Sequence, residues 1–308
     1  MSVLDDAPGL ARRWIAAARP RTLPAAVAPV LVGSACALRA GGFAPVVALT
    51  ALAVALLLQV GTNFVNDWGD HRRGADGPDR LGPARAVAAG WVTPAQMAAA
   101  GALAFAAAAA LGALLLARGG AWAALLGVAS IASGIAYTAG PFPLAYRGLG
   151  ELFVFAFFGP VAVCGTELVQ ARAVSALAVA ASVPVGLLAA AILVVNNVRD
   201  VDADRRAAKN TLAVRFGAPA ARRLHTGLVG TALLSPLVLW SSGLASAAVL
   251  VALAAMVPAI APLRVVRTRR DGPALNRALA DTARVHLVFG ALLAAGIALP
   301  VVLGTGVR

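Results

Sequence analysis

The stretch VVALTALAVALLLQVGTNFVNDWGDHRRGAD, residues 46–76, joins a long apolar run to a group of amides and carboxylates. Between residues 46 and 60 only Thr50 and Gln59 are polar, whereas residues 63–76 hold two asparagines and three aspartates. A carboxylate inside a membrane helix costs at least about 2.5–3.5 kcal/mol. The pattern therefore predicts a helix that crosses a membrane and presents acidic groups at its end for a purpose other than solvation.

Apolar runs of similar length recur through the 308-residue chain, which is 60% hydrophobic and has a mean hydropathy of +0.84. Charged residues make up 13%, about half the share found in ordinary globular proteins. Each run is near the ~20 residues that a membrane helix needs. We therefore expect an all-α integral membrane protein with a single domain, residues 1–308. About nine transmembrane helices are expected, over residues 23–38, 43–66, 93–117, 121–140, 149–170, 174–197, 220–242, 243–263 and 285–304.

The start of the chain is expected to be a retained first helix and not a signal peptide, because Pro24 and Pro29 interrupt the apolar run and a long charged segment precedes it. With the N-terminus in the cytoplasm, 22 of the 26 lysines and arginines fall on the cytoplasmic side. This agrees with the enrichment of basic residues in cytoplasmic loops. The net charge of +13 is thus mostly a matter of topology. No nucleic-acid partner is expected, because short loops beside a membrane hold no binding module.

A second acidic group, NNVRDVDAD at residues 196–204, follows the sixth apolar run. Both groups follow an even-numbered span and are expected on the same, cytoplasmic face. At about 100° per residue, four side chains of each group fall on one side of a helix. They are Asn63, Asn66, Asp67 and Asp70 in the first group, and Asn196, Asn197, Asp200 and Asp204 in the second. If the two helix ends face each other, their carboxylates form an oxygen site that suits Mg²⁺ or Ca²⁺. The alternative is a set of solvated loop charges.

Cations surround both acidic groups, and Lys209 is the only lysine of the chain. A composition that favours arginine yet contains one lysine fits a role for a compact ammonium group. A lysine retained by chance explains the composition equally well. Carboxylates, a divalent cation and nearby arginines together suit a phosphate or diphosphate held through Mg²⁺. At a membrane face, such a ligand is expected to carry a lipid tail.

The segments NDWGD (residues 66–70) and NNVRDVDAD (residues 196–204) resemble the two Asp-rich motifs of the UbiA-type intramembrane prenyltransferases. ARPRTLPAAVAPVLVGSA (18–35), YTAGPFPLAYRGLGELFVFAFFGPVAVCGT (137–166) and KNTLAVRFG (209–217) resemble the branch that prenylates 1,4-dihydroxy-2-naphthoate. The resemblance spans nearly the whole chain. It implies a nine-helix bundle around a central cavity with a cytoplasmic polar cap, in a bacterial inner membrane with the N-terminus and both motifs on the cytoplasmic side.

The resemblance also implies the reaction. A long-chain prenyl group would pass from a prenyl diphosphate, in membrane lipid, to 1,4-dihydroxy-2-naphthoate with loss of CO₂, giving the demethylmenaquinol of menaquinone biosynthesis. Mg²⁺, as two ions, would be held by Asn66, Asp67, Asp70, Asp76, Asp200 and Asp204. The catalytic set would be Asp67, Asp70, Asp200, Asp204 and Lys209. Substrate contacts are expected from Asn63, Arg72, Arg73, Arg80, Arg85, Tyr137, Tyr146, Arg147, Asn197 and Arg199.

Two positions depart from the pattern of this branch. The branch usually has Gly-Lys where this chain has Ala208-Lys209, which is expected to stiffen the loop. It often has two aromatic residues where this chain has Glu167-Leu168, which leaves the selection of chain length open.

Other functions stay open at this point. Within the enzyme class, the acceptor could be 4-hydroxybenzoate, haem, a chlorophyllide or a sugar phosphate. A divalent-cation transporter would also place acids in a membrane. It would need polar groups across the whole membrane, whereas Glu167 is nearly alone away from the predicted cytoplasmic side. A purely structural membrane protein would need no convergent acids.

Overall fold

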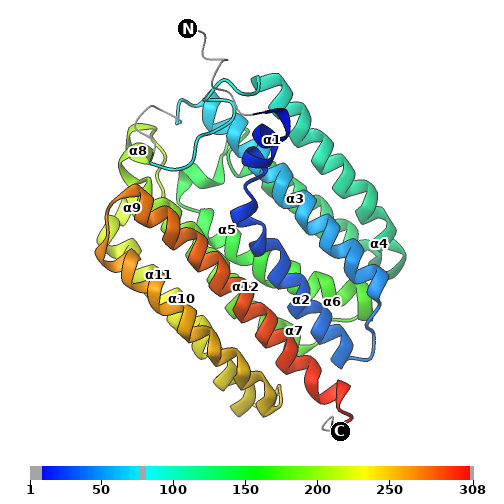
Figure 1. Cartoon of the computed structure of the whole chain (residues 1–308). Coiled ribbons are helices and arrows are strands. Elements are labelled where there is room, and N and C mark those ends of the chain that lie inside the picture. Colours follow the sequence, from blue (N-terminus) through cyan, green and yellow to red (C-terminus); the bar gives the residue numbers. More distant parts are fainter. Residues whose placement is uncertain (1–8, 76–80, 306–308) are drawn as a thin grey trace.

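The computed structural model describes residues 9–75 and 81–305, so the predicted ligand Asp76 and the predicted contact Arg80 lie outside the described residues. Every regular element in the described ranges is helical, and the long helices run side by side (Figure 1). The prediction of an all-α membrane protein is confirmed. The short elements α1 (Leu10–Ala18), α8 (Val201–Arg206) and α9 (Leu212–Phe216) gather at one end of the bundle (Figure 1).

The first half of the bundle contains α2 (Pro24–Arg39), α3 (Pro45–Arg72) and α4 (Pro94–Ala136), with the short η1 (Pro20–Thr22) ahead of α2. Each of these four helices begins with a proline. Proline suits the first helical position because the N–H group that it lacks has no partner there. The sequence therefore sets where these helices start.

The second half begins with η2 (Leu144–Arg147) and a broken helix made of α5 (Gly150–Ala156), the π-helical η3 (Phe157–Val161) and α6 (Ala162–Ala171). It continues with α7 (Ala176–Arg199), then α10 (Ala218–Ser241), η4 (Ala247–Ala255), α11 (Met256–Thr268) and α12 (Gly272–Val302). The expected boundary between the spans 220–242 and 243–263 is confirmed to within one residue, because α10 ends at Ser241 and Gly243 takes a positive φ of 75°.

In the described residues, seven helices are long and apolar enough to cross a membrane, or up to eight if the segment Leu10–Thr22 and α2, which meet at a bend of 51°, count as one span. The expected nine spans place two spans, 93–117 and 121–140, where the seven helices include α4 as a single helix. Gly120 has non-helical angles (φ 56°, ψ −146°) inside α4. A Cβ atom on Gly134 would lie 3.1 Å from Phe105, so the two arms of α4 fold back on each other. The number nine stays a prediction.

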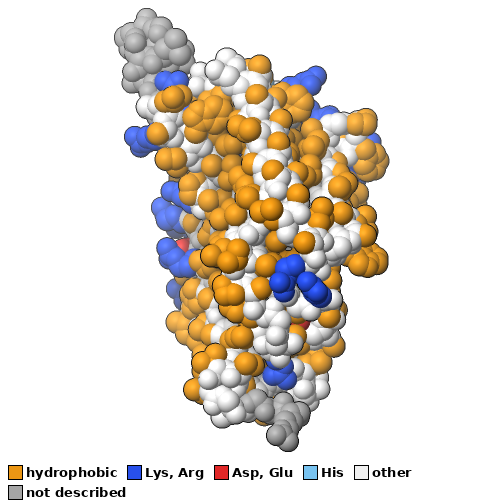
Figure 2. Space-filling model, turned by 90° about the vertical axis from the view of Figure 1, so that its right-hand side faces the viewer, with side chains coloured by type: hydrophobic (Ala, Val, Ile, Leu, Met, Phe, Trp, Pro, Cys, Tyr) orange, Lys and Arg blue, Asp and Glu red, His pale blue; other side chains and the backbone are white. Residues whose placement is uncertain are grey.

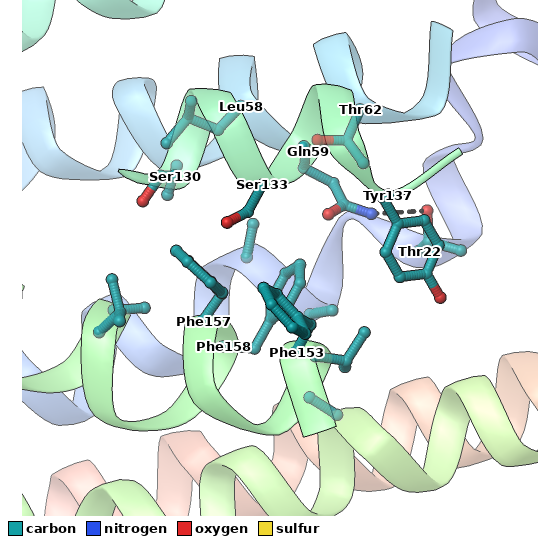
Figure 3. Close-up of a pocket in the computed structure, with 18 of the residues that line it drawn as sticks. Thr22, Leu58, Gln59, Thr62, Ser130, Ser133, Tyr137, Phe153, Phe157 and Phe158 are labelled. Atoms are coloured by element: carbon teal, nitrogen blue, oxygen red, sulfur yellow. Dashed lines mark hydrogen bonds between the residues drawn. The ribbon is translucent and has the colours of Figure 1, made fainter. Parts of the chain in front are cut away.

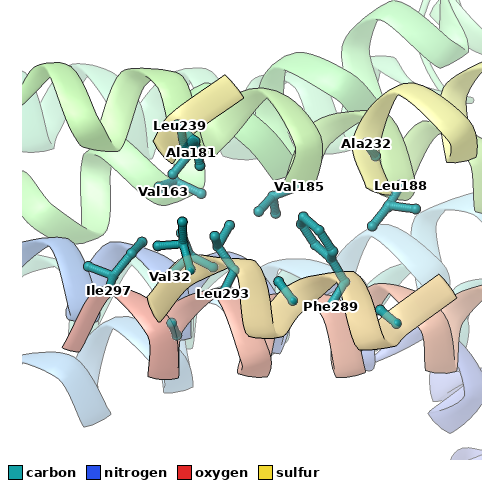
Figure 4. Close-up of a cluster of buried hydrophobic side chains, with 14 of the residues drawn as sticks. Val32, Val163, Ala181, Val185, Leu188, Ala232, Leu239, Phe289, Leu293 and Ile297 are labelled. Atoms are coloured by element: carbon teal, nitrogen blue, oxygen red, sulfur yellow. The ribbon is translucent and has the colours of Figure 1, made fainter. Parts of the chain in front are cut away.

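The largest hydrophobic cluster joins α2, α6, α7, α10, η4 and α12 (Figure 4). Phe289 and Leu293 of α12 are fully buried against Val185 and Leu188 of α7. Many large apolar side chains on the outer surface are exposed instead, including Val46 at 76% and Leu103 at 72%. Figure 2 shows hydrophobic atoms spread over the middle of one face. A surface of this kind faces lipid rather than water.

Glu167, which had no expected role, joins α6 to α7. It is completely buried, and its two carboxylate oxygens accept hydrogen bonds from the backbone N–H (2.8 Å) and the hydroxyl (2.7 Å) of Ser175. Ser175 is the N-cap of α7, and its hydroxyl oxygen also accepts the N–H of Ala178. Because both oxygens have donors, Glu167 fixes the turn between the two helices.

Candidate active site

A cavity of about 360 Å³ lies between α2, α3, the two arms of α4, the α5–η3–α6 segment and α7. Its lining includes no residue of α10, η4 or α11, although all three are described. One group of lining residues is polar and comes from the ends of α3 and α7 and from the loops beside them. It consists of Asn63, Asn66, Asp70, Arg85, Asn196, Asn197 and Lys209.

Beyond this polar group the cavity is mostly apolar. Figure 3 shows Phe153, Phe157 and Phe158 on one wall, and Leu58, Ser130 and Ser133 on the opposite wall. The rings of Phe153 and Phe157 stack with centroids 6.0 Å apart and planes 12° from parallel. The predicted wall residue Tyr137 lines the cavity as well (Figure 3). The cavity thus fits a ligand with a polar head and an apolar tail.

Lys209 brings the two acidic motifs together. Its Nζ lies 3.9 Å from Asp70 Oδ2 and 3.8 Å from Asp204 Oδ1. Lys209 lies in this position because the backbone turns at Ala208, whose φ is +53°. The Lys209 N–H then donates to the carbonyl oxygen of Asp204 at 2.8 Å. The single lysine therefore stands where the expected metal and diphosphate site would be.

Asp70 is the most connected carboxylate of the cavity. Its Oδ2 accepts from Arg85 Nη2 at 2.7 Å, and its Oδ1 accepts from the Tyr146 hydroxyl at 2.9 Å. Arg73 and Lys209 lie over the Tyr146 ring at 5.2 and 5.4 Å from its centroid. Burial, with the Asp70 charge as a second cause, raises the pKa of Tyr146 above its ordinary value. The phenol therefore keeps its proton and donates to Asp70 at neutral pH.

Asp67 and Asp200 point elsewhere. Asp67, which is 1% exposed, accepts hydrogen bonds from the backbone N–H groups of Ala86 (3.0 Å) and Val87 (3.3 Å). Asp200 is bound through both oxygens by Arg199 at 2.8 and 2.6 Å. Neither aspartate lines the main cavity. Asp67 thus holds the segment at residues 86–87, and Asp200 is paired with the arginine next to it in the chain.

The expected shared helix face of the second motif ends at Asp200. The helix α7 stops at Arg199, and the separate helix α8 begins at Val201, so 100° per residue no longer applies beyond the break. Asn196 and Asn197 line the cavity, whereas Asp204 does not line it but contacts the lining residue Lys209. The first motif keeps one helix, α3, and places Asn63, Asn66 and Asp70 at the cavity.

Two of these asparagines also tie helices together. Asn63 Nδ2 donates to the Ala18 carbonyl at 2.9 Å, which holds the segment before α2 against α3. Asn66 Oδ1 accepts from the Thr138 hydroxyl at 2.8 Å. Both asparagines therefore line the cavity while each side chain has a partner in a neighbouring segment.

Four predicted cations of the described residues lie outside the cavity lining: the buried Arg199, which binds Asp200, and the exposed Arg72, Arg73 and Arg147. Arg72 stacks over Trp68 at 5.0 Å, and Arg147 stacks over Phe142 at 3.7 Å. Arg73 donates to the carbonyl oxygens of Thr138 and Gly140. All three side chains belong to exposed residues. Arg147 is therefore not placed to reach an acceptor inside the cavity in this conformation.

Sequence reasoning missed Glu151, Arg19 and the three phenylalanines of the wall, all of which line the cavity. The signal for Glu151 was available: it is an acidic residue one position into an apolar segment, on the expected cytoplasmic side. Arg19 gave no such signal, because its segment carries several arginines.

The oxygen donors fit a hard divalent cation. Asp70 and Asp204 approach one ammonium group, so a positive charge already lies between the two motifs. Carboxylate and amide oxygens are the ligands that Mg²⁺ takes. Within the described ranges, no three acidic, histidine or cysteine side chains form a cluster that could hold a metal ion. The two motifs are near each other, and Lys209 bridges them through Asp70 and Asp204.

Comparisons with known proteins agree with this architecture. Residues 26–289 match the model of the UbiA prenyltransferase family. The chain is 40% identical over 286 residues to a 1,4-dihydroxy-2-naphthoate octaprenyltransferase of Mycobacterium tuberculosis, with 93% of this chain and 97% of the relative covered. A UbiA homologue of Aeropyrum pernix has a similar fold, with a TM-score of 0.62, 20% identity, and 89% and 97% of the two chains covered. A UbiA homologue of Archaeoglobus fulgidus, solved with GPP and Mg²⁺, gives a TM-score of 0.61 at 14% identity over 91% of this chain and 99% of its own. The chain therefore belongs to the UbiA prenyltransferase family.

Proposed function

We propose that this protein transfers a long-chain prenyl group from a prenyl diphosphate to 1,4-dihydroxy-2-naphthoate with loss of CO₂, as in menaquinone biosynthesis. The observation that carries the proposal is the cavity, whose polar group contains Lys209 between the two acidic motifs and whose remaining surface is mostly apolar, with an aromatic wall. The name of the relative at 40% identity supports the naphthoate as acceptor. The other UbiA acceptors, from 4-hydroxybenzoate to sugar phosphates, are the alternatives.

The diphosphate head is proposed to bind at the polar group. Lys209 and Arg85 line the cavity there and can donate to phosphate oxygens. Asn66, Asp67, Asp70, Asp200 and Asp204, with Asp76 beyond the described residues, are the proposed Mg²⁺ ligands, for two ions. The homologue solved with GPP and Mg²⁺ supports this cofactor. When bound, Mg²⁺ would neutralise the diphosphate and make it a better leaving group. Asp67 and Asp200 would have to exchange their present donors for the metal.

The aromatic wall is proposed to hold the carbon that becomes cationic when diphosphate leaves. The faces of Tyr137, Phe153 and Phe157 carry negative electrostatic potential and can stabilise such a cation. The apolar walls also exclude water, which would otherwise capture the cation. Each buried CH₂ of the tail contributes about 0.8 kcal/mol to binding.

Location follows from the same proposal. A multi-pass membrane protein is shown by the apolar helices and the family. We propose that it lies in a bacterial inner membrane as one domain, with the N-terminus and both acidic motifs in the cytoplasm, because most basic residues then face inward.

The test is product formation by the purified full chain in lipid nanodiscs with prenyl diphosphate and 1,4-dihydroxy-2-naphthoate. Mg²⁺-dependent prenylated naphthoquinone, lost with EDTA and in Asp70→Asn and Asp204→Asn proteins, is the expected result. A diphosphate-binding preparation that forms no product would exclude the naphthoate. A preparation that binds no diphosphate but carries a divalent cation across vesicles would favour the transporter.

A further inference from the structure

Glu151 is a buried acid at the cavity that the motifs do not explain. It lies in the first turn of α5, is 7% exposed, and lines the same cavity as Lys209 and Asp70. Its Oε1 accepts a hydrogen bond from Asn197 Nδ2 at 2.9 Å. Its Oε2 is buried and has no hydrogen-bond partner among residues 9–75 and 81–305. An unsatisfied buried carboxylate oxygen is costly, so its retention at a cavity points to a ligand.

Asp70 and Glu151 are the two carboxylates among the described lining residues, and their surroundings differ. Asp70 contacts Arg85 at 2.7 Å and Lys209 at 3.9 Å, so its charge is compensated. Glu151 has one amide donor and no ion pair within the described part of the chain. Glu151 therefore has an oxygen available to accept a proton, whereas Asp70 is paired with Arg85 and Lys209.

The groups around Glu151 suit an aromatic acceptor. A Cβ atom on the adjacent Gly150 would lie 3.0 Å from the Tyr137 hydroxyl, so the tyrosine packs directly against this turn. Phe153 lies two residues further along the same helix and also lines the cavity. A flat hydroxylated ring bound in the cavity beside this turn can therefore present a hydroxyl group to the free oxygen.

We propose that Glu151 is the general base that accepts a hydroxyl proton of the dihydroxynaphthoate, with Asn197 orienting its carboxylate. This inference rests on the proposed function. The allylic C–O bond breaks and diphosphate leaves, and the ring carbon that bears the carboxylate bonds to the allylic carbon. The O–H bond of the adjacent hydroxyl breaks, its electron pair forms a C=O bond to the ring, and Glu151 takes the proton. When CO₂ leaves, the electrons of the broken C–C bond return to the ring oxygen, which takes the proton back. Glu151 thus ends the cycle as it began.

The test separates ionisation of the donor from transfer to the acceptor. Exchange of ¹⁸O between bridging and non-bridging positions of a labelled prenyl diphosphate, measured without acceptor, reports ionisation alone. Single-turnover product formation reports transfer. Both are measured on the full chain in nanodiscs with Mg²⁺, for the wild type, Glu151→Gln, Glu151→Asp and the control Glu167→Gln. Glu167 is the matched control because it is also a buried acid of the α5–α6 segment, but both its oxygens have donors.

Glu151→Gln is expected to slow transfer about 10²–10⁴-fold, the usual contribution of a general base, with isotope exchange unchanged. Glu151→Asp keeps a carboxylate and should retain more transfer than Glu151→Gln. Glu167→Gln should transfer at the wild-type rate. Unimpaired transfer by Glu151→Gln, or a parallel loss of exchange and transfer in both Glu151 variants, would overturn the inference while leaving the proposed function intact. A wild type that exchanges isotope but prenylates no naphthoate would overturn both.

Discussion

At the residue scale, the central contact is between Lys209 and the two acidic motifs. The ammonium lies within 4 Å of Asp70 and of Asp204, which are far apart in the sequence. The uniqueness of this lysine was visible in the sequence, but its partners were not. They depend on a sharp turn at Ala208, which no helical periodicity predicts.

Replacing Lys209 by Met should lower the rate of prenyl transfer about 10²–10³-fold, because one donor to the developing diphosphate charge is lost. The rate would be measured in nanodiscs with saturating Mg²⁺. Arg205→Met is the control, since Arg205 forms only an exposed pair with Asp202 at 3.4 Å. Equal rates of prenyl transfer for Lys209→Met and Arg205→Met would show that Lys209 does not act on the diphosphate.

Replacing Ala208 by Gly should stabilise the protein by about 1 kcal/mol, because a residue with a Cβ atom is disfavoured at positive φ. Ala208 has φ +53°, whereas its neighbour Ala207 has φ −84°. Thermal unfolding in detergent should show a higher midpoint for Ala208→Gly and a lower or unchanged one for Ala207→Gly. A lower midpoint for Ala208→Gly would show that the turn is not built as described.

At the element scale, the sequence predicted which helices carry the two motifs but not how they end. The long α3 continues through Asp70, so its predicted face holds for Asn63, Asn66 and Asp70. The helix α7 stops at Arg199, which binds Asp200 and also donates to Asn276 at 2.7 Å. The end of this helix depends on contacts with α12, and contacts of this kind cannot be read from local sequence.

The crossing of α7 with the α5–η3 segment depends on two glycines. A Cβ atom on Gly186 would lie 2.6 Å from the Phe155 carbonyl oxygen, and one on Gly159 would lie 2.7 Å from the Ser182 carbonyl oxygen. Gly186→Ala should therefore destabilise the protein by about 1–3 kcal/mol through overpacking, seen as a lower midpoint of thermal unfolding.

Gly227→Ala is the matched control for this crossing. Gly227 also lies inside a helix, α10, but a Cβ atom there would meet nothing within 4 Å. Alanine should raise the midpoint slightly, because glycine inside a helix costs about 0.5–1 kcal/mol relative to alanine. Similar losses for both variants would mean that helix propensity, and not the close crossing, sets the effect.

At the scale of the whole molecule, composition alone predicted an all-helical membrane protein, because 60% hydrophobic residues in long runs exclude a soluble core. The position of the cavity was not predictable, since it lies to one side, with α10, η4 and α11 outside it. Its aromatic wall was missed for the same reason. A phenylalanine in an apolar run gives the same sequence pattern whether its side chain faces lipid, a neighbouring helix or a cavity.

The proposed site is tested most directly by a crystal structure with Mn²⁺ and an unreactive prenyl thiodiphosphate. The anomalous signal of Mn²⁺ locates the metal. We expect Mn²⁺ between Asp70 and Asp204, with the diphosphate beside Lys209 and the prenyl chain along Phe153 and Phe157. Mn²⁺ bound away from both motifs, or a diphosphate at the opposite end of the cavity near Leu115, would contradict this expectation.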